Sequence, residues 1–251
     1  MKKLFFVFIL CLAVLQLSAQ TKLTVAVAAN MQYTIKALIA AYNMTDKTKI
    51  DVVIGASGGL TQQIMHGAPF DIFVSADKEF PQKLAENNFT LLTPKVYAQG
   101  LLVLWSAKPG IRPDANMKVL LGTNIKSIAI ANPKTAPYGS AAEAILKKYA
   151  LYDKVATRLI RGESITQTSQ FIATQNADIG FTAKSIVISD EMKGKGTWVE
   201  LNTKDYPAIE QSAALLKHAQ ENNKAAAEKF YNFLYSAKAK AIYHQFGYIV
   251  K

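Results

Sequence analysis

The feature of this 251-residue chain that most constrains its fold is a regular alternation of short apolar stretches with longer amphipathic ones. Residues 23–28 are apolar apart from one threonine, and residues 31–42 carry apolar side chains three and four positions apart. Short apolar runs are typical of buried strands, and the wider spacing is typical of helices with one buried face. Strands that alternate with helices are characteristic of parallel sheets covered by helices on both faces. The pattern therefore predicts an α/β protein.

The alternation continues along the chain and is interrupted once. Residues 108–124, with two prolines and two glycines, break the pattern near the middle, and apolar residues return at 212–216. We therefore predict two α/β lobes, each with a mixed or parallel sheet flanked by helices, joined by two hinge crossings. The first lobe is expected at 20–98, the second at 99–212, and C-terminal helices that return to the first lobe at 213–251. Strands are expected at 23–28, 51–54, 70–75, 97–105, 127–131, 158–160 and 177–182, and helices at 31–42, 59–66, 81–87, 140–149, 166–175 and 222–243.

The first nineteen residues have the layout of a secretory signal peptide. Lys2 and Lys3 provide a basic start, residues 4–15 form an uninterrupted apolar run, and Ala19 ends a small-residue cleavage sequence. Because the run is too short to span a bilayer comfortably, removal of residues 1–19 is favoured over a retained anchor. The only cysteine, Cys11, lies inside this segment, so the exported chain is expected to have no disulfide.

The formal net charge of +11 does not indicate a nucleic-acid binder. Lysines are spread from Lys22 to Lys251 without a dense run, and the chain has only three arginines. Sequence-reading nucleic-acid binders gather arginine and lysine on one element together with base-contacting or stacking residues. We therefore interpret the lysines as a solvated surface whose mild positive potential helps to collect a small anion.

The chain contains no motif of a familiar catalytic or metal site. His66, His218 and His244 fall on different predicted elements and fit no metal-ligand spacing. Asp71 and Asp77 flank a predicted strand, but a hard cation usually gathers several oxygen ligands. We expect instead that Asp77 caps the helix that follows it.

Four strand-to-helix turns carry the small and polar residues that an anion site needs. They are AAN at 28–30, GASGG at 55–59, APYGS at 136–140 and GESIT at 162–166, two in each predicted lobe. Helix N-termini present N–H groups without an acceptor and a partial positive potential, so they hold anions without a charged side chain. Four of them around one cleft would suit a fully ionised oxyanion, which offers only acceptors. The same residues also serve as ordinary helix caps, and the pattern alone leaves both interpretations open.

Five longer stretches show a resemblance to a known family. They are TVAVAAN at 24–30, GASGGLTQQI at 55–64, GAPFDIFVSAD at 67–77, ANPKTAPYG at 131–139 and NADIGF at 176–181. In this order they closely resemble the molybdate-binding proteins of bacterial ABC importers, which bind molybdate or tungstate. The resemblance runs from about residue 23 to 248, almost the whole chain after the signal peptide. It implies a two-lobed, periplasmic-binding-protein-like fold of type II.

The resemblance also implies a function. An exported, periplasmic solute-binding protein of this kind would capture molybdate or tungstate between its lobes with neutral hydrogen-bond donors. It would then deliver the anion to an ABC permease in the inner membrane. Such a protein is expected to be a monomer without a cofactor, not an enzyme and not a nucleic-acid binder. Molybdenum would be present only in the bound molybdate, with no protein atom as a direct metal ligand.

The residues implied to hold the anion come from the four turns. Asn30, next to Ala29, matches the first-turn donor and would use its backbone N–H and its side-chain amide. Ser57 matches the second-turn serine, which donates its hydroxyl and its N–H. Tyr138 and Ile165 match positions in the third and fourth turns that contribute only a backbone N–H.

Three further residues are candidates for the same site. Gly58 and Gly139 adjoin two of the matched positions. Ala183 stands where some members of the family place a tyrosine hydroxyl on the ligand, although a branch with Asn in the first turn and Tyr in the third also lacks that tyrosine. The number of donors therefore stays open. We interpret the neighbouring Lys184 as a surface residue.

Two alternatives to a molybdate binder remain open at this point. Sulfate differs from molybdate in bond length rather than in charge or shape, so the size of the cavity decides between a molybdate binder and a sulfate or phosphate binder. An exported enzyme that acts on a phosphorylated or sulfated substrate would use the same pocket. It would need a base beside its nucleophile, and Ser57 has no identifiable histidine partner.

Overall fold

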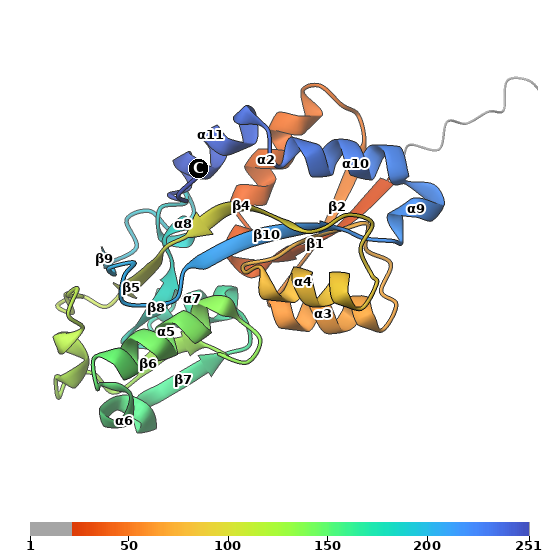
Figure 1. Ribbon diagram of the computed structural model, residues 1–251. Coiled ribbons are helices and arrows are strands. Elements are labelled where there is room, and N and C mark those ends of the chain that lie inside the picture. Colours follow the sequence, from red (N-terminus) through yellow and green to blue (C-terminus); the bar gives the residue numbers. More distant parts are fainter. Residues whose placement is uncertain (1–21, 251) are drawn as a thin grey trace, which may run out of the picture.

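The structure is a computed structural model that describes residues 22–250. The predicted signal peptide, residues 1–19 with Cys11, lies outside the described residues. The described chain forms two lobes, each built on a five-stranded mixed sheet that is flanked by helices (Figure 1). The predicted two-lobed α/β fold is therefore confirmed. Among residues 22–250, no helix is long and apolar enough to cross a membrane.

The first sheet holds its helices on both faces because its strands are apolar on both faces. Its strands are, in order, β2 (Lys49–Gly55), β1 (Lys22–Ala28), β3 (Ile72–Val74), β10 (Ile209–Leu215) and β4 (Lys95–Gly100). Its helices are α2 (Thr34–Asn43), α10 (Lys224–Phe233) and α11 (Ala237–Gln245) on one face and α3 (Ser57–Met65) and α4 (Glu79–Glu86) on the other (Figure 1). Successive residues of a strand point to opposite faces. Val25 and Val27 accordingly belong to the core under α2 and α10, and Ala26 belongs to the core under α3 and α4.

The second sheet repeats the arrangement of the first. Its strands are, in order, β7 (Leu159–Gly162), β6 (Ile128–Ala131), β8 (Ile179–Ala183), β5 (Leu102–Ser106) and β9 (Thr197–Glu200). Its helices are α5 (Pro137–Lys148), α6 (Tyr152–Val155), α7 (Ile165–Ala173) and α8 (Lys184–Val187). β6 runs parallel to β7 and β8, as β1 runs parallel to β2 and β3. Because the carboxyl ends of parallel strands share one edge of a sheet, each lobe presents two strand-to-helix turns at such an edge.

The single strand predicted over 97–105 is wrong, because the segment is two strands in different sheets. β4 pairs with β10 in the first sheet, and β5 pairs with β8 and β9 in the second. The change takes place at Leu101, between Gly100 at the end of β4 and Leu102 at the start of β5, and the residues around it are mostly buried. Only glycine fits at position 100, because a Cβ there would lie 2.0 Å from the hydroxyl oxygen of Tyr138.

The chain returns to the first sheet between the end of β9 and the start of β10. Together with the change at Leu101, this makes the two predicted hinge crossings (Figure 1). The predicted limits of the lobes, at 20–98, 99–212 and 213–251, stay a prediction.

The helical stretch predicted over 222–243 consists of separate helices. A short α9 (Ala219–Asn222) precedes α10, and α10 and α11 are separate helices. Ser236 makes the break, since its hydroxyl accepts the N–H of Ala239 at 3.2 Å and so caps the start of α11. Both long helices pack against the first sheet.

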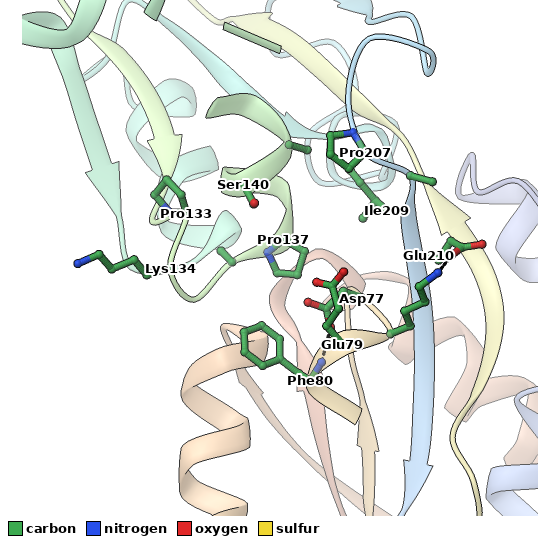
Figure 2. A pocket seen from close by; sticks show the side chains of 14 residues that line it. Asp77, Glu79, Phe80, Pro133, Lys134, Pro137, Ser140, Pro207, Ile209 and Glu210 are labelled. Atoms are coloured by element: carbon green, nitrogen blue, oxygen red, sulfur yellow. Dashed lines mark hydrogen bonds and ion pairs between the residues drawn. The ribbon is translucent and has the colours of Figure 1, made fainter. Parts of the chain in front are cut away.

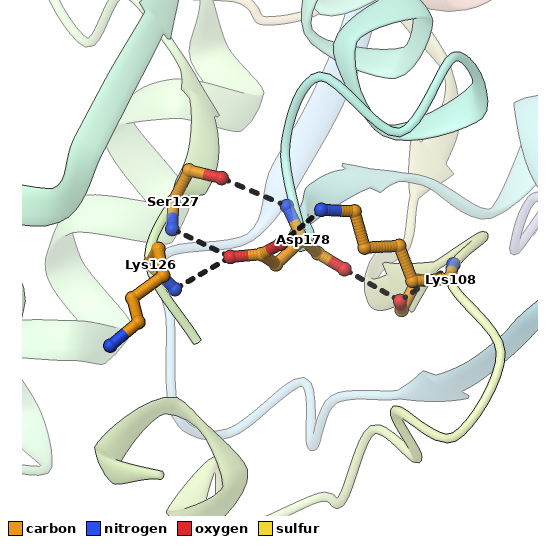
Figure 3. Close-up of polar contacts among 5 residues, drawn as sticks. Lys108, Lys126, Ser127 and Asp178 are labelled. Carbon is orange, nitrogen blue, oxygen red and sulfur yellow. Dashed lines mark hydrogen bonds and ion pairs between the residues drawn. The ribbon is translucent and has the colours of Figure 1, made fainter. Parts of the chain in front are cut away.

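Two buried aspartates hold the amino ends of matching strands together. Asp71 precedes β3 and accepts the N–H of Thr24 on β1 at 2.8 Å. Asp178 precedes β8, accepts the N–H of Ser127 beside β6 at 2.9 Å and forms an ion pair with Lys108 (Figure 3). Burial raises the pKa of Asp178, but the hydrogen bonds from Lys108 and from backbone N–H groups outweigh it, so the pKa lies below its ordinary value. Both carboxylates thus fix strand positions within a lobe.

Candidate functional site

The four strand-to-helix turns meet at one small cavity between the lobes. The turn after β1 continues into a short 3-10 helix, η1 (Ala29–Met31), and the other three turns lead into α3, α5 and α7. The cavity is small and partly open to solvent. Every residue that the resemblance assigns to the anion from these turns lines it. The complete lining is Ala28, Ala29, Asn30, Ala56, Ser57, Ala76, Ala136, Pro137, Tyr138 and Ile165.

The cavity is lined mainly by small and apolar side chains, and its polar groups are neutral. No charged side chain occurs among the described residues that line it. Ser57 and Ile165 are the first residues of α3 and α7, and Tyr138 is the second residue of α5. Backbone N–H groups in the first turn of a helix have no acceptor within that helix. The three helix starts therefore bring N–H donors from both lobes to one place.

Ser57 adds a hydroxyl that is ready to donate. Its side chain is buried, and its Oγ accepts the N–H of Ala76, at the end of β3, at 3.0 Å. Because this bond uses a lone pair of the oxygen, the hydroxyl hydrogen is left for a guest. A hydrogen bond from this hydroxyl to a charged oxygen would be of the strong, charge-assisted kind.

Asn30 presents its amide differently from the expectation. Its Nδ2 donates to Gln211 Oε1 at 2.9 Å and to the hydroxyl of Tyr248 at 3.1 Å. Its Oδ1 is buried and has no hydrogen-bond partner among the residues that the structure describes. In this orientation the amide has an acceptor to spare and no donor. Donation from the Asn30 side chain to an anion therefore requires the opposite orientation of the amide.

The Tyr138 side chain faces away from the solvent, into the crossing between the lobes. Its ring is 1% exposed, and its hydroxyl accepts the N–H of Gln211 Nε2 at 3.1 Å. Burial raises the pKa of Tyr138 well above its ordinary value, so the hydroxyl stays neutral. The side chain therefore packs behind the site, and the backbone is the part of Tyr138 that faces a guest.

The three further candidates do not line the cavity. The N–H of Gly58 donates to the carbonyl of Thr135 at 2.9 Å, and the N–H of Gly139 donates to the carbonyl of Ala136 at 2.8 Å. Ala183 is buried at the end of β8, opposite Leu102 of β5.

Lys184, next to Ala183, is engaged elsewhere. Its ammonium forms an ion pair with Glu200 at 2.6 Å, and both side chains are partly exposed. This agrees with its interpretation as a surface lysine. The lysine next to Ala183 is therefore paired with a carboxylate.

The two lobes touch directly around the cavity. Besides the bond from Gly58 to Thr135, the Thr166 hydroxyl donates to the carbonyl of Ala29 at 3.2 Å. The Ser185 hydroxyl donates to the carbonyl of Asn30 at 3.0 Å. Each of these bonds joins the first lobe to the second, so the structure is in a closed state. These three bonds are between neutral groups, and Lys36 of α2 forms an exposed ion pair with Glu191 of the second lobe at 3.9 Å.

Sequence reasoning missed several residues that position the site. Thr166 and Ser185 join the lobes, and Gln211 and Tyr248 hold the Asn30 amide. Gln211 is fully buried in β10, but the neighbouring Glu210 and Ser212 are polar too, so no pattern marks it. The contacts of Thr166 and Ser185 depend on the position of the second lobe, and Tyr248 reaches Asn30 from the far end of the chain, so none of the three had a signal.

A wider cleft opens beside the cavity and shares Ala136 and Pro137 with it (Figure 2). Asp77 lies in its wall. Burial, followed by the charge of Glu79, raises the pKa of Asp77 to about 6, against the lowering effect of hydrogen bonds. The Asp77 carboxylate accepts the N–H of Phe80 at 3.1 Å, which confirms its predicted role at the start of α4.

The titratable residues do not gather into a catalytic or metal site. Within residues 22–250, no group of three His, Asp, Glu or Cys side chains is placed to hold a metal ion. His218 Nδ1 lies 3.2 Å from Asp71, and His66 Nδ1 lies 2.7 Å from the carbonyl of Gln62 in its own helix. Among the described residues, no histidine lines the cavity or contacts Ser57.

Comparison with known proteins places this geometry in a family. The molybdate-binding protein ModA of Azotobacter vinelandii is 38% identical over 225 residues, which cover 89% of this chain and 88% of the relative. ModA of Rhodobacter capsulatus is 37% identical over 235 residues, which cover 93% of this chain and 90% of the relative. These matches confirm the resemblance noted in the sequence.

A solved structure shows the same fold. The periplasmic molybdate-binding protein of Azotobacter vinelandii superimposes with a TM-score of 0.86 at 36% identity, covering 91% of this chain and 99% of that one. The family model described as bacterial extracellular solute-binding protein matches residues 23–249, nearly the whole described chain. The chain therefore belongs to the bacterial extracellular solute-binding proteins.

Proposed function

We propose that this protein captures molybdate or tungstate between its lobes and delivers the anion to an ABC permease. The observation that carries the proposal is the cavity itself. Three helix starts and the Ser57 hydroxyl, drawn from both lobes, surround a small space that no charged side chain of residues 22–250 lines. A fully ionised oxyanion offers only acceptors, and this lining offers it only neutral donors, once the Asn30 amide is turned.

The mechanism is closure of one lobe on the other. The donors on Ser57 belong to the first lobe, and those on Tyr138 and Ile165 belong to the second. Only the closed state brings both sets within reach of one small anion, so the anion stabilises that state by its differential affinity. The neutral lobe-to-lobe bonds around the cavity add to the closed state whether or not the anion is present.

Because the cavity offers the oxyanion only neutral hydrogen-bond donors, it also selects the protonation state of that oxyanion. A protonated oxyanion would bring an O–H group against N–H donors, leaving both without an acceptor. Neutral donors on helix N-termini are expected to favour the dianion for this reason.

The cellular setting follows from the family and from the sequence. The Azotobacter vinelandii and Rhodobacter capsulatus relatives are named as molybdate-binding proteins. We infer that the signal peptide at 1–19 exports the chain to the periplasm, where it acts as a monomer with an inner-membrane permease as its partner. No reaction and no cofactor are part of this function.

Calorimetry of the mature chain, from residue 20 to 251, with molybdate, tungstate, sulfate and phosphate tests the proposal. Molybdate and tungstate should bind with a 1:1 stoichiometry and raise the melting temperature, as any ligand of the native state does. Tight binding of sulfate or phosphate with no response to molybdate would replace the proposal by the alternative oxyanion binder. Turnover of a phosphate or sulfate ester would instead favour the enzyme.

A further inference from the structure

A buried glutamine connects the proposed anion site to both lobes. Gln211 lies in β10, and its side chain is fully buried. Its Oε1 accepts the Asn30 amide N–H at 2.9 Å and the Tyr97 hydroxyl at 3.0 Å, and its Nε2 donates to the Tyr138 hydroxyl at 3.1 Å. Asn30 and Tyr138 line the cavity, whereas Gln211 does not. Gln211 therefore lies directly behind two residues of the site.

Two features of the backbone place Gln211 there. The pairing of β10 with β4 shifts its register between Gln211 and Ser212, and such an irregularity re-aims a side chain. At the end of β4, a Cβ on Gly100 would lie 2.5 Å from Gln211 Nε2 and 2.0 Å from Tyr138 Oη. Gly100 thus leaves open the space in which Gln211 meets Tyr138.

One buried acceptor next to Gln211 has no hydrogen-bond partner among the described residues. Both hydrogens of Asn30 Nδ2 are engaged, by Gln211 and by the Tyr248 hydroxyl. Asn30 Oδ1 is buried and has no partner within the described chain. A buried acceptor without a donor is costly and calls for an explanation. A bound anion would increase this cost, because an anion needs a hydrogen-bond donor where Asn30 presents the acceptor Oδ1.

The same cluster has a second arrangement that supplies the donor. The oxygen and nitrogen ends of an amide are nearly equal in size, so turning both amides by about 180° leaves the heavy atoms in place. Gln211 Nε2 then donates to Asn30 Oδ1 and to the Tyr97 oxygen, and Gln211 Oε1 accepts from the Tyr138 hydroxyl. Tyr97 can still donate, because the carbonyl of Ser75 lies 3.2 Å from its hydroxyl.

Tyr248 completes the second arrangement. Its hydroxyl now accepts from Asn30 Nδ2 at 3.1 Å and donates to the Asn30 carbonyl at 3.3 Å. After the turn it donates to Asn30 Oδ1 instead. Asn30 Nδ2 is then released at the corner where Oδ1 had no partner. The two amides have to turn together, because turning one alone would bring two donors or two acceptors face to face.

We propose that Gln211 is a positioning residue that sets the direction of the Asn30 amide, and that the two amides turn together when a fully ionised oxyanion binds. The inference rests on the proposed function, because the turned state gains a partner only from a guest that accepts hydrogen bonds. It also explains why a glutamine, which can donate and accept, lies behind a site that must only donate.

The tyrosines around Gln211 keep the cluster neutral during this change. Burial raises the pKa of Tyr97 and of Tyr138 well above the ordinary value, and it raises the pKa of Tyr248 as well. Each hydroxyl therefore retains its hydrogen and can serve as donor or acceptor. The cluster changes by rotation of groups and needs no proton from solvent.

A double-mutant cycle tests the proposal through molybdate affinity. An ionised glutamate in Gln211→Glu offers two acceptors and no donor, so it holds the Asn30 N–H groups toward itself and away from the anion. Gln211→Glu should weaken molybdate binding about 10- to 100-fold beyond any effect of charge alone, the range for a hydrogen bond to a charged group. The control background is Asn30→Ala, in which Gln211→Glu retains its charge effect but has no amide to direct.

The expected result is a much smaller loss from Gln211→Glu in the Asn30→Ala background than in the natural one. Equal fold losses in both backgrounds would overturn the proposal, since Gln211 would then act by charge or packing. The natural protein is measured alongside. If it binds no molybdate, the proposed function fails; if it binds and the cycle shows no coupling, only the role of Gln211 fails.

A direct measurement covers the case in which Gln211→Glu does not fold. Neutron diffraction from crystals of the natural protein with molybdate, exchanged into deuterated water, distinguishes the nitrogen end of an amide from the oxygen end. Deuterium on Asn30 Nδ2 pointing at an anion oxygen, with Gln211 Nε2 facing Asn30 Oδ1, would support the paired turn. Asn30 Nδ2 still facing Gln211 with the anion bound would refute it.

Discussion

Replacing Ser57 by alanine is the substitution for which the structure gives the most definite expectation. The Ser57 hydroxyl is a side-chain donor in the cavity that is not already engaged as a donor, and its oxygen accepts the Ala76 N–H at 3.0 Å. Ser57→Ala therefore removes two bonds of different kinds. One is made only when the anion is bound, and the other is made in the free protein too.

The two bonds predict two separate magnitudes. A hydrogen bond to a charged group contributes about 1.5–3 kcal/mol, so molybdate should bind roughly 10- to 150-fold more weakly to Ser57→Ala. Ala76 is only 3% exposed, and its N–H loses its acceptor in this variant. The unpartnered N–H should lower the free energy of unfolding by about 1–3 kcal/mol. Calorimetric titration measures the first change, and urea unfolding of the anion-free protein measures the second.

Thr61→Val is a matched control for the loss of stability. The buried Thr61 hydroxyl donates to the carbonyl of Ser57 at 2.8 Å, one turn further along α3, and does not line the cavity. This variant should lose about 1 kcal/mol of stability and keep its affinity within about twofold. Molybdate binding to Ser57→Ala within twofold of the natural protein would refute the role of the hydroxyl, as would an equal loss of affinity in Thr61→Val.

Three further substitutions test other parts of the account. Asp178→Ala should lower the free energy of unfolding by about 3 kcal/mol at pH 7, since it leaves Lys108 and backbone N–H groups without their acceptor. The pKa of Asp178 is lowered in the folded state, so this loss of stability should become smaller as the pH falls below about 4. Urea unfolding at several pH values measures both. The pKa of Asp77 is raised to about 6, so the folded state binds more protons than the unfolded one between about pH 4 and 6. The natural protein should therefore lose up to about 3 kcal/mol of stability as the pH rises through that range, and Asp77→Asn should not; equal pH profiles in urea would contradict this. Lys184→Ala should change molybdate affinity by less than about threefold in calorimetry, because Lys184 pairs with Glu200; a larger loss would mean that a lysine helps to hold the anion.

Sequence patterns predict the parts of this site that depend on local structure. Asn30, Ser57 and Ile165 stand where a strand gives way to a helix, and the chemistry of helix starts is encoded in the few residues around them. Pro137 at the first position of α5 is a signal of the same kind, since its fixed backbone angle suits a helix start. The four turns could therefore be identified before their meeting point was known.

Features that depend on the packing of one lobe against the other could not be predicted in this way. Leu101 separates two strands of different sheets, yet most residues on both sides of it are buried, so periodicity carries no sign of the change. Gly58 illustrates the same limit. It adjoins a site residue in sequence, but its N–H is used by Thr135 of the other lobe, a contact that only the closed structure reveals.

The central claim is that neutral groups from both lobes hold the anion. A crystal structure of the mature protein with molybdate, with molybdenum located by its anomalous scattering, tests it most directly. The account predicts one molybdenum atom in the cavity lined by Asn30, Ser57, Tyr138 and Ile165. The molybdate oxygens should lie about 2.7–3.1 Å from backbone N–H groups of both lobes and from the Ser57 hydroxyl, with no lysine or arginine in contact. A molybdenum site on surface lysines or arginines, with this cavity empty, would contradict the account.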